Sequence, residues 1–292
     1  MKVERLRPEC ISCVMKNQIE KYPADISDDK KIEYMQRILQ VISQVPKTMS
    51  APEIVYQINA VQKEMFGAQH DYTEEKYHFN KIMLEWEDKV SELLDESNEP
   101  LLRAIQYAMM GNYIDFGAME NVEEKLLVKL LTDAEENKIN LEQYEALKKD
   151  LSTAKKVVYL LDNCGEIVFD KLMIQLLQKL YPALEITAMV RGGNVQNDVT
   201  MEDAEQVGLT EVTHVMGNGA SVAGTCLELI SEEARREIET ADVVISKGQG
   251  NFETLRKCGL NIYYIFLCKC DMFAREFNVP RFTGMLINDK DC

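Results

Sequence analysis

KKVVYLLDNCGEIVFDKLMIQLLQKLYPALEITAMVRGGN, residues 155–194, decides the fold class of this chain. Its first residues form a short aliphatic and β-branched run that ends in polar residues, and EITAMVRGGN repeats that form. Between the two runs, VFDKLMIQLLQKLY has apolar residues at helical spacing. A strand, a helix and a second strand in this order favour the α/β class, with a mainly parallel sheet covered by helices on both faces.

The same form recurs three more times before the chain ends. The later strand runs are TEVTHVMGNG (210–219), ADVVISKGQGN (241–251) and NIYYIFLCKC (261–270), and SEEARREIET lies between two of them. Each run finishes in a polar or glycine-rich tip. In parallel sheets, ligands bind at the carboxyl ends of the strands, so these tips together predict a functional site.

The first half of the chain has a different rhythm. SDDKKIEYMQRILQVISQV and SAPEIVYQINAVQKEMF show helical spacing, with Ser27 and Ser50 as expected N-caps. Residues 72–97 and 98–117 continue the helical pattern without a convincing strand. We therefore expect an all-helical region over residues 1–150 and an α/β domain over residues 151–292.

Composition and charge exclude several classes of protein. Of the 292 residues, 46% are hydrophobic and 28% charged, and the net charge is -16. Such a surface repels nucleic acids and anionic membranes, so neither is an expected partner. No apolar run approaches the roughly 18 residues of a membrane span, and MKVERLRPEC is unlike a signal peptide. These features predict a cytoplasmic protein whose 8 cysteines are reduced thiols.

Two of the tips carry oxygen ligands suited to a hard cation. Asp162 and Asn163 directly follow the first strand run, and Asp198 follows RGGNVQN at the second. Carboxylate and amide oxygens suit Mg²⁺ or Mn²⁺. The alternative is that Asp162 and Asp198 cap the helices that follow them. Arg191 either pairs with an anion or forms a salt bridge.

Two other tips carry lysines. Lys247 stands beside Gly248 and Gly250, and exposed N–H groups with a lysine would suit a phosphate. Lys269 follows the apolar run IYYIFL, where a lysine is unusual without a partner. For Lys247, the ordinary alternative is a solvated loop lysine.

Taken together, these tips resemble the signature blocks of the metal-dependent damage-control phosphatases, the ARMT-like family. The resemblance covers nearly the whole chain, with the blocks in family order. The N-terminal Cys-x-x-Cys of this chain resembles that of the family's prokaryotic subclass. The blocks are PECISC, GNYIDFG, DNCGEIVFD, VRGGNVQNDVT, DVVISKGQGNFETL and FLCKC.

The resemblance implies an α/β/α sandwich with a Rossmann-like sheet, and hydrolysis of phosphate esters of small metabolites, such as sugar phosphates or damaged phosphometabolites. It implies a divalent metal, Mn²⁺, Ni²⁺, Co²⁺ or Mg²⁺. Asp162 is a candidate nucleophile, with metal-activated water as the alternative. The residues implied are Asp162, Asn163 and Asp198 for the metal, Lys247 and Lys269 for the phosphate, and Asn112, Asp115, Glu166 and Asn251 for the substrate.

Other readings remain open at this point. An S-adenosylmethionine-dependent carboxyl methyltransferase would need a glycine-rich first turn, whereas DNCGE is rich in metal ligands. A non-catalytic metal- or metabolite-binding protein is the third reading. Cys10 and Cys13 have half the spacing of a zinc site and leave open a second, structural metal. The sequence does not specify the oligomeric state.

Overall fold

The computed structural model describes residues 5–23, 25–67, 70–110 and 139–292. The chain divides into two compact units, residues 1–71 and 72–292. The sequence pattern predicted a boundary at residue 150, and in the described residues all strands follow that position. The compact units divide the chain earlier, because the helices between residues 72 and 153 pack in the same unit as the sheet.

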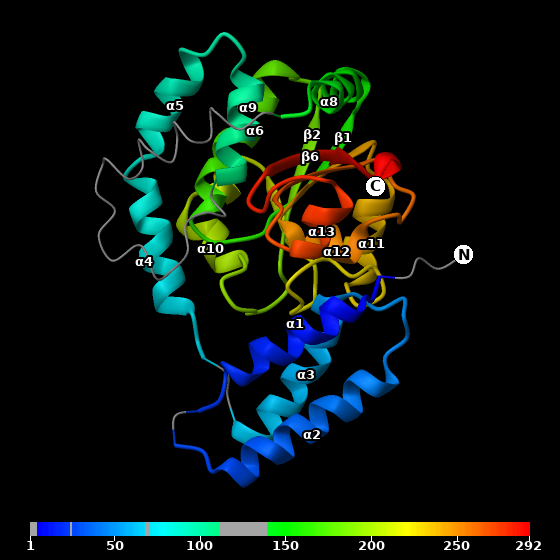
Figure 1. Ribbon diagram of the computed structural model, residues 1–292. Helices are drawn as coiled ribbons and strands as arrows, with labels where there is room; N and C mark the ends of the chain where they lie inside the picture. Colours follow the sequence, from blue (N-terminus) through cyan, green and yellow to red (C-terminus); the bar gives the residue numbers. More distant parts are fainter. Residues whose placement is uncertain (1–4, 24, 68–69, 111–138) are drawn as a thin grey trace. The chain divides into compact units, whose positions relative to one another are not determined.

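Among its described residues, the first unit contains the helices α1 (Pro8–Ile19), α2 (Asp28–Gln44) and α3 (Ala51–Phe66) (Figure 1). Ser27 caps α2 by accepting a hydrogen bond from the Lys30 N–H at 3.4 Å. The Ser50 N–H donates to the Glu53 carboxylate at 2.7 Å as part of a capping box. Both expected caps are therefore confirmed. The core of this unit is formed by Val14, Tyr34, Ile38, Ile42, Ile54 and Ile58.

The second unit is built on a six-stranded sheet in the order β3-β2-β1-β4-β5-β6. The first five strands in that order are parallel and β6 is antiparallel to β5. The expected parallel sheet is confirmed, and the sixth strand is an addition that the sequence did not predict. The strands are β1 (Lys156–Leu160), β2 (Glu185–Val190), β3 (His214–Gly217), β4 (Val243–Lys247), β5 (Ile262–Leu267) and β6 (Gly284–Asn288).

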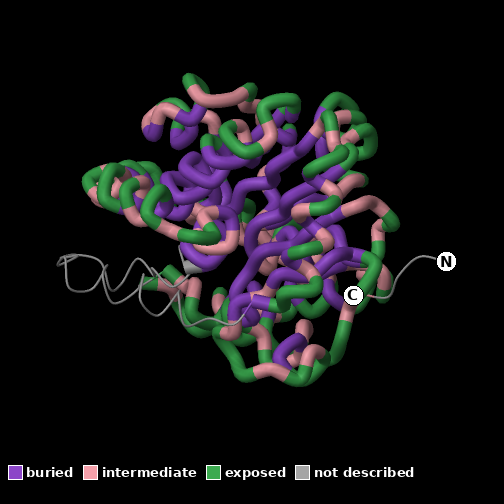
Figure 2. The backbone as a smooth tube through the Cα atoms, turned by 90° about the horizontal axis from the view of Figure 1, so that it is seen from above, coloured by how far each residue is buried: buried purple, intermediate pink, exposed green. Residues whose placement is uncertain are grey.

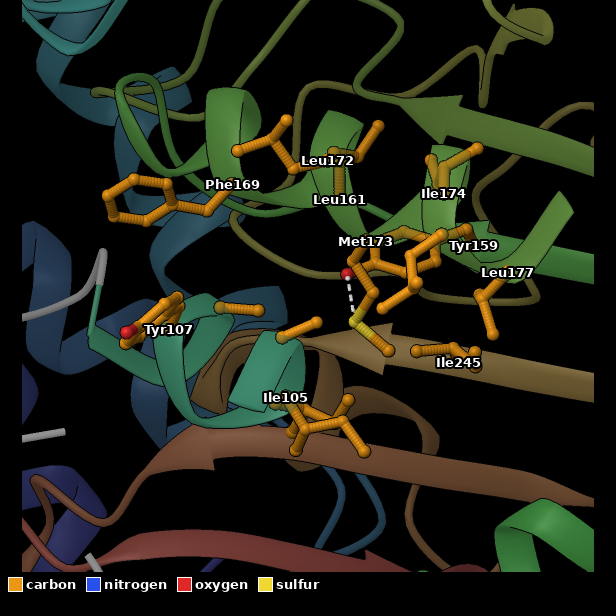
Figure 3. Packing of buried hydrophobic residues seen from close by; sticks show 14 of the residues in the cluster. Ile105, Tyr107, Tyr159, Leu161, Phe169, Leu172, Met173, Ile174, Leu177 and Ile245 are labelled. Carbon is orange, nitrogen blue, oxygen red and sulfur yellow. Dashed lines mark hydrogen bonds between the residues drawn. The ribbon is translucent and has the colours of Figure 1, made fainter. Parts of the chain in front are cut away.

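Helices cover both faces of this sheet. Alternate residues of a strand point to opposite faces, so Tyr159 of β1 lies in one apolar core and Leu160 in the other. In Figure 3, Met173 and Leu177 of α9 pack toward Tyr159 and Ile245. One face is covered by α4 (Thr73–Leu84), α5 (Glu87–Asp95), α6 (Pro100–Met110), α8 (Leu141–Thr153), α9 (Glu166–Leu180) and α10 (Met201–Gln206), and the other by α11 (Glu232–Glu239), α12 (Gln249–Leu255) and α13 (Asp271–Glu276).

The burial pattern explains why the strand runs are continuous in apolar residues. All six residues of β5 and all five of β4 are buried, as are 11 of the 15 residues of α9. Figure 2 colours the backbone by burial, with buried residues in purple. Strands covered on both faces cannot alternate between apolar and polar residues. Within the described ranges, no helix has the length and apolar character needed to cross a lipid bilayer.

The strand order places a switch point between β1 and β4. From β1 the chain passes through α9 to β2 on one side, whereas β4 lies on the other side of β1. At such a point the loops after the two strands diverge and leave a crevice at their carboxyl ends. Asp162 follows β1 and Gly248 follows β4, so both residues stand at this switch point.

Candidate active site

The turn after β1 is joined to the loop after β2 through the backbone. Asn163 forms an isolated antiparallel bridge with Asp198. The Cys164 N–H donates to the Asn197 carbonyl at 2.9 Å, and the Val199 N–H donates to the Asp162 carbonyl at the same distance. The structure therefore brings the three expected metal ligands together. Their role as ligands stays a prediction.

The capping alternative for the two aspartates is wrong. Helix α9 begins at Glu166 with Gly165 as its N-cap, and α10 begins at Met201 with Thr200 as its N-cap. Asp162 and Asp198 therefore stand outside the capping positions. Their carboxylates are directed to a buried arginine instead.

Arg191 joins these two carboxylates. Its Nη2 lies 3.1 Å from Asp162 Oδ1 and its Nε lies 2.6 Å from Asp198 Oδ2. Its Nη1 donates to Asn251 Oδ1 at 3.0 Å, and the arginine is only 2% exposed. The salt-bridge interpretation of Arg191 is confirmed. A guanidinium has five N–H donors in one plane, so it can bind two carboxylates and an amide at the same time.

Asn251 is fully buried and connects the ends of β1 and β4. Its Nδ2 donates to the carbonyls of Lys247 at 2.7 Å and Leu161 at 3.2 Å. Its Oδ1 accepts from Arg191 and from the Thr225 hydroxyl, the latter at 2.8 Å. Both ends of the amide are thus occupied within the protein, an arrangement that favours a positioning role.

Lys247 has an environment that the sequence did not suggest. The residue is fully buried, and its Nζ forms ion pairs with Glu166 and, at 2.8 Å, with Asp170. The Tyr159 hydroxyl donates to the same Asp170 oxygen at 2.7 Å. Glu166 lies in turn 3.4 Å from the Asn163 amide nitrogen. The lysine therefore supports the turn that carries Asn163.

Lys269 is exposed at the tip of β5. The Gln249 side-chain oxygen accepts hydrogen bonds from the backbone N–H groups of Lys269 at 2.9 Å and of Cys270 at 3.2 Å. The positive charge of Lys269 stabilises the ionised form of Asp162 and so opposes the rise in that group's pKa. Of the two expected lysines, Lys269 is the one open to solvent.

The buried network contains more acidic than basic side chains. Among the described side chains that these contacts connect, four are carboxylic acids and two are cations. Burial raises the pKa of Asp162 and Asp170, raises that of Asp198 to about 7, and raises that of Glu166 to about 8. The acids are Asp162, Glu166, Asp170 and Asp198, and the cations are Arg191 and Lys247.

This donor set fits a divalent cation in charge and in chemistry. If all four acids were ionised, these buried side chains would carry two more negative than positive charges in a low-dielectric site. The expected ligands supply carboxylate and amide oxygens, which hard divalent cations prefer. In the described ranges no group of three or more His, Cys, Asp or Glu side chains is placed to hold a metal. The expected set contains only two such groups and an amide.

Gly248 is packed directly against Asp162. Its φ is +82°, and a Cβ added there would lie 2.0 Å from Asp162 Oδ2. We expect Gly248→Ala to displace the carboxylate and to lower both the affinity for a divalent cation and kcat, each by about 10-fold or more. Titration calorimetry with Mn²⁺ would measure the first. Gly208→Ala, also at positive φ but with open space around the Cβ, is the matched control and should leave both unchanged.

The remaining predicted residues are placed as follows. Asn112 and Asp115 lie outside the described residues. Cys10 and Cys13 lie on α1 in the first unit, one helical turn apart. Asp170 was missed by the sequence analysis, although its spacing of four from Glu166 on an apolar helix is a usable signal.

Comparison with known proteins gives a consistent result. Residues 6–283 match the family described as "Damage-control phosphatase ARMT1-like domain". An uncharacterized protein of Methanocaldococcus jannaschii is 32% identical over 297 residues, which cover 97% of this chain and 95% of that protein. A protein of Pyrococcus horikoshii named damage-control phosphatase is 28% identical over 293 residues, covering 98% and 99%.

A solved structure is similar in fold. The crystal structure of a DUF89 family protein from Pyrococcus horikoshii superposes with a TM-score of 0.82 at 24% sequence identity. The match covers 97% of this chain and 99% of that one. This likeness supports the α/β architecture described above.

Proposed function

The chain belongs to the family of damage-control phosphatases with an ARMT1-like domain, and on this premise we propose that it hydrolyses phosphate monoesters of small metabolites in a metal-dependent reaction. Family membership supports phosphatase activity, including activity toward damaged metabolites. To this activity the proposal adds three specific points: the substrates are phosphate monoesters, the reaction needs a divalent cation, and named residues bind the cation and the phosphate. It also keeps the cytoplasmic location expected from the sequence.

The observation that carries the metal dependence is the excess of buried carboxylates at the switch point. Asp162 and Asp198 share one arginine, and burial opposes the ionisation of both. An acidic chain of net charge -16 also needs a local source of positive charge to bind a phosphate ester. A cation held between the β1 and β2 tips would meet both requirements.

The side chains at the tips have distinct proposed roles. Asp162, Asn163 and Asp198 would hold Mn²⁺, Ni²⁺, Co²⁺ or Mg²⁺. Such a cation, when bound, supplies a Lewis acid that polarises a phosphate oxygen and offsets developing negative charge. Lys269, exposed at the β5 tip and electrostatically coupled to Asp162, would bind the remaining phosphate oxygens.

Three other residues support the side chains that would bind the cation and the phosphate. Lys247 and Glu166 hold one another beneath the β1 turn, and Asn251 holds Arg191. For Lys247 and Asn251, this geometry favours positioning over the direct contact with phosphate or substrate that the resemblance implies. Asp162 and a water molecule remain the two candidates for the attacking group.

A phosphatase assay with metal-stripped protein tests the proposal. We expect no phosphate release from p-nitrophenyl phosphate after chelation, and release after addition of at least one of Mn²⁺, Ni²⁺, Co²⁺ and Mg²⁺. A panel of sugar phosphates would then define the ester class. Release that survives chelation would contradict the metal dependence. Folded protein that binds a cation yet releases no phosphate with any ester would favour a binding protein.

A further inference from the structure

Asn80 of α4 is a fully buried amide that contacts the turn after β1. Its Oδ1 accepts a hydrogen bond from the Gly165 N–H at 2.6 Å. Its Nδ2 donates to Asp203 Oδ1 at 3.0 Å and to Gln206 Oε1 at 2.9 Å. A single side chain thus joins the turn that carries Asn163 to helix α10, which packs beside α4 (Figure 1).

Asp203 links the same helix to the loop after β2. Its Oδ2 accepts from the Thr200 N–H at 2.8 Å and lies 2.6 Å from Lys76 Nζ. Thr200 stands two residues after Asp198. Lys76 and Asn80 are four residues apart on α4, so they share one face of that helix.

The turn after β1 also makes a close steric contact with α4. Gly165 has a φ of +71°, and a Cβ there would lie 2.0 Å from the ring of Phe79. The turn therefore reaches α4 at backbone distance, which only glycine allows. Phe79 and Asn80 together contact the peptide that follows Asp162, Asn163 and Cys164.

We propose that Asn80 and Asp203 are positioning residues that set the separation of the two metal-ligand loops. The proposal rests on the proposed function, because it assigns the cation to Asp162, Asn163 and Asp198. Asn80 holds the first loop through Gly165, and Asp203 holds the second through Thr200. The hydrogen bond between Asn80 and Asp203 ties the two loops to each other.

The polarity of that hydrogen bond allows a sharp test. Asn80→Asp keeps an acceptor for the Gly165 N–H but places a second carboxylate against Asp203. Adding Asp203→Asn restores a donor on the opposite side and keeps one oxygen for the Thr200 N–H and Lys76. The double variant therefore reverses this bond without removing it, while the donation from residue 80 to Gln206 is lost in Asn80→Asp and in the double variant alike. With Asp203→Asn measured alone as well, these variants form a double-mutant cycle that isolates the coupling between the two residues.

The measurement is the Mn²⁺ dissociation constant of the metal-stripped full chain, by titration calorimetry, with thermal unfolding beside it. We expect Asn80→Ala and Asn80→Asp to weaken Mn²⁺ binding about 10- to 100-fold, as loss of an outer-shell contact does. The double variant is expected to recover the part of that loss that comes from the bond between residues 80 and 203. Met83→Ala, a core truncation on the same helix, should lower the unfolding temperature and leave the dissociation constant unchanged.

Three outcomes overturn the proposal. Asn80 variants that fold and bind Mn²⁺ as tightly as the wild type would sink this inference alone. A folded double variant that binds Mn²⁺ as weakly as Asn80→Asp would also contradict this inference. That comparison can be made even if Asn80→Ala fails to fold. Wild-type protein that binds no Mn²⁺, Ni²⁺, Co²⁺ or Mg²⁺ would overturn the metal site and this inference together.

Discussion

Replacing Asp162 with asparagine is expected to lower kcat by about 10³-fold or more, because the variant loses a charged ligand at the proposed metal site. An amide keeps the shape of the side chain and an oxygen for Arg191 Nη2, now 3.1 Å away. It does not keep the negative charge that a divalent cation requires. Phosphate release with saturating Mn²⁺ would measure the effect.

The same substitution has an opposite expected effect on the stability of the metal-free protein. Burial raises the pKa of Asp162, so its ionised form is less favourable in the folded than in the unfolded chain. A carboxyl with a raised pKa lowers stability as the pH rises toward and through that pKa. Asp162→Asn removes the cost, and we expect a free energy of unfolding at pH 7.5 equal to or above the wild-type value.

This combination separates a lost ligand from a lost fold. Asp95→Asn, at an exposed carboxylate paired with Lys179, is the matched control and should change neither quantity. An Asp162→Asn protein that keeps metal-dependent activity would remove Asp162 from the site. One that is inactive because it unfolds would contradict the charge argument.

Lys247→Met is expected to lower the free energy of unfolding by about 3–5 kcal/mol, because it leaves two buried carboxyl groups without their cation. Methionine matches the length of the lysine chain, so little cavity is created. Urea unfolding followed by circular dichroism would measure the change. Lys179→Met, at an exposed ion pair, should cost well under about 1 kcal/mol.

The loss should depend on pH in a defined direction. The pKa of Glu166 is raised to about 8 by burial, and that of Asp170 is raised for the same reason. As the pH falls below 8, Glu166 becomes protonated in the wild type and in Lys247→Met. A neutral Glu166 gains less from the Lys247 ammonium, so the loss of that ammonium then lowers the free energy of unfolding less. The difference between variant and wild type is therefore expected to grow as the pH rises through about 8. A variant with wild-type stability but no activity would instead support direct phosphate binding by Lys247.

Local sequence rhythm determined the architecture of the second unit. Apolar runs alternating with amphipathic stretches predicted five parallel strands and the helices between them, because burial on both faces is visible in the strand itself. The rhythm did not predict β6. A five-residue run carries no information about its direction, and β6 runs antiparallel because of where the chain returns after α13.

The site divides in the same way. Position at a strand tip predicted Asp162, Asn163, Asp198 and Lys269 as site residues, since parallel strands bring their carboxyl ends to one edge. The environment of each group came only from tertiary structure. Lys247 was expected to face a phosphate, yet its partners Glu166 and Asp170 stand 81 and 77 residues away and enclose it in the core.

The sequence by itself therefore determined which residues follow the strand ends, and tertiary structure decided what each one contacts there. Strand and helix periodicities are local and leave a record in neighbouring residues. Hydrogen bonds such as that from Gly165 to Asn80, 85 residues apart, leave none. The positions of Asp162 and Asp198 at strand tips belong to the first kind of information, and the contacts of Arg191, Asn251 and Lys247 belong to the second.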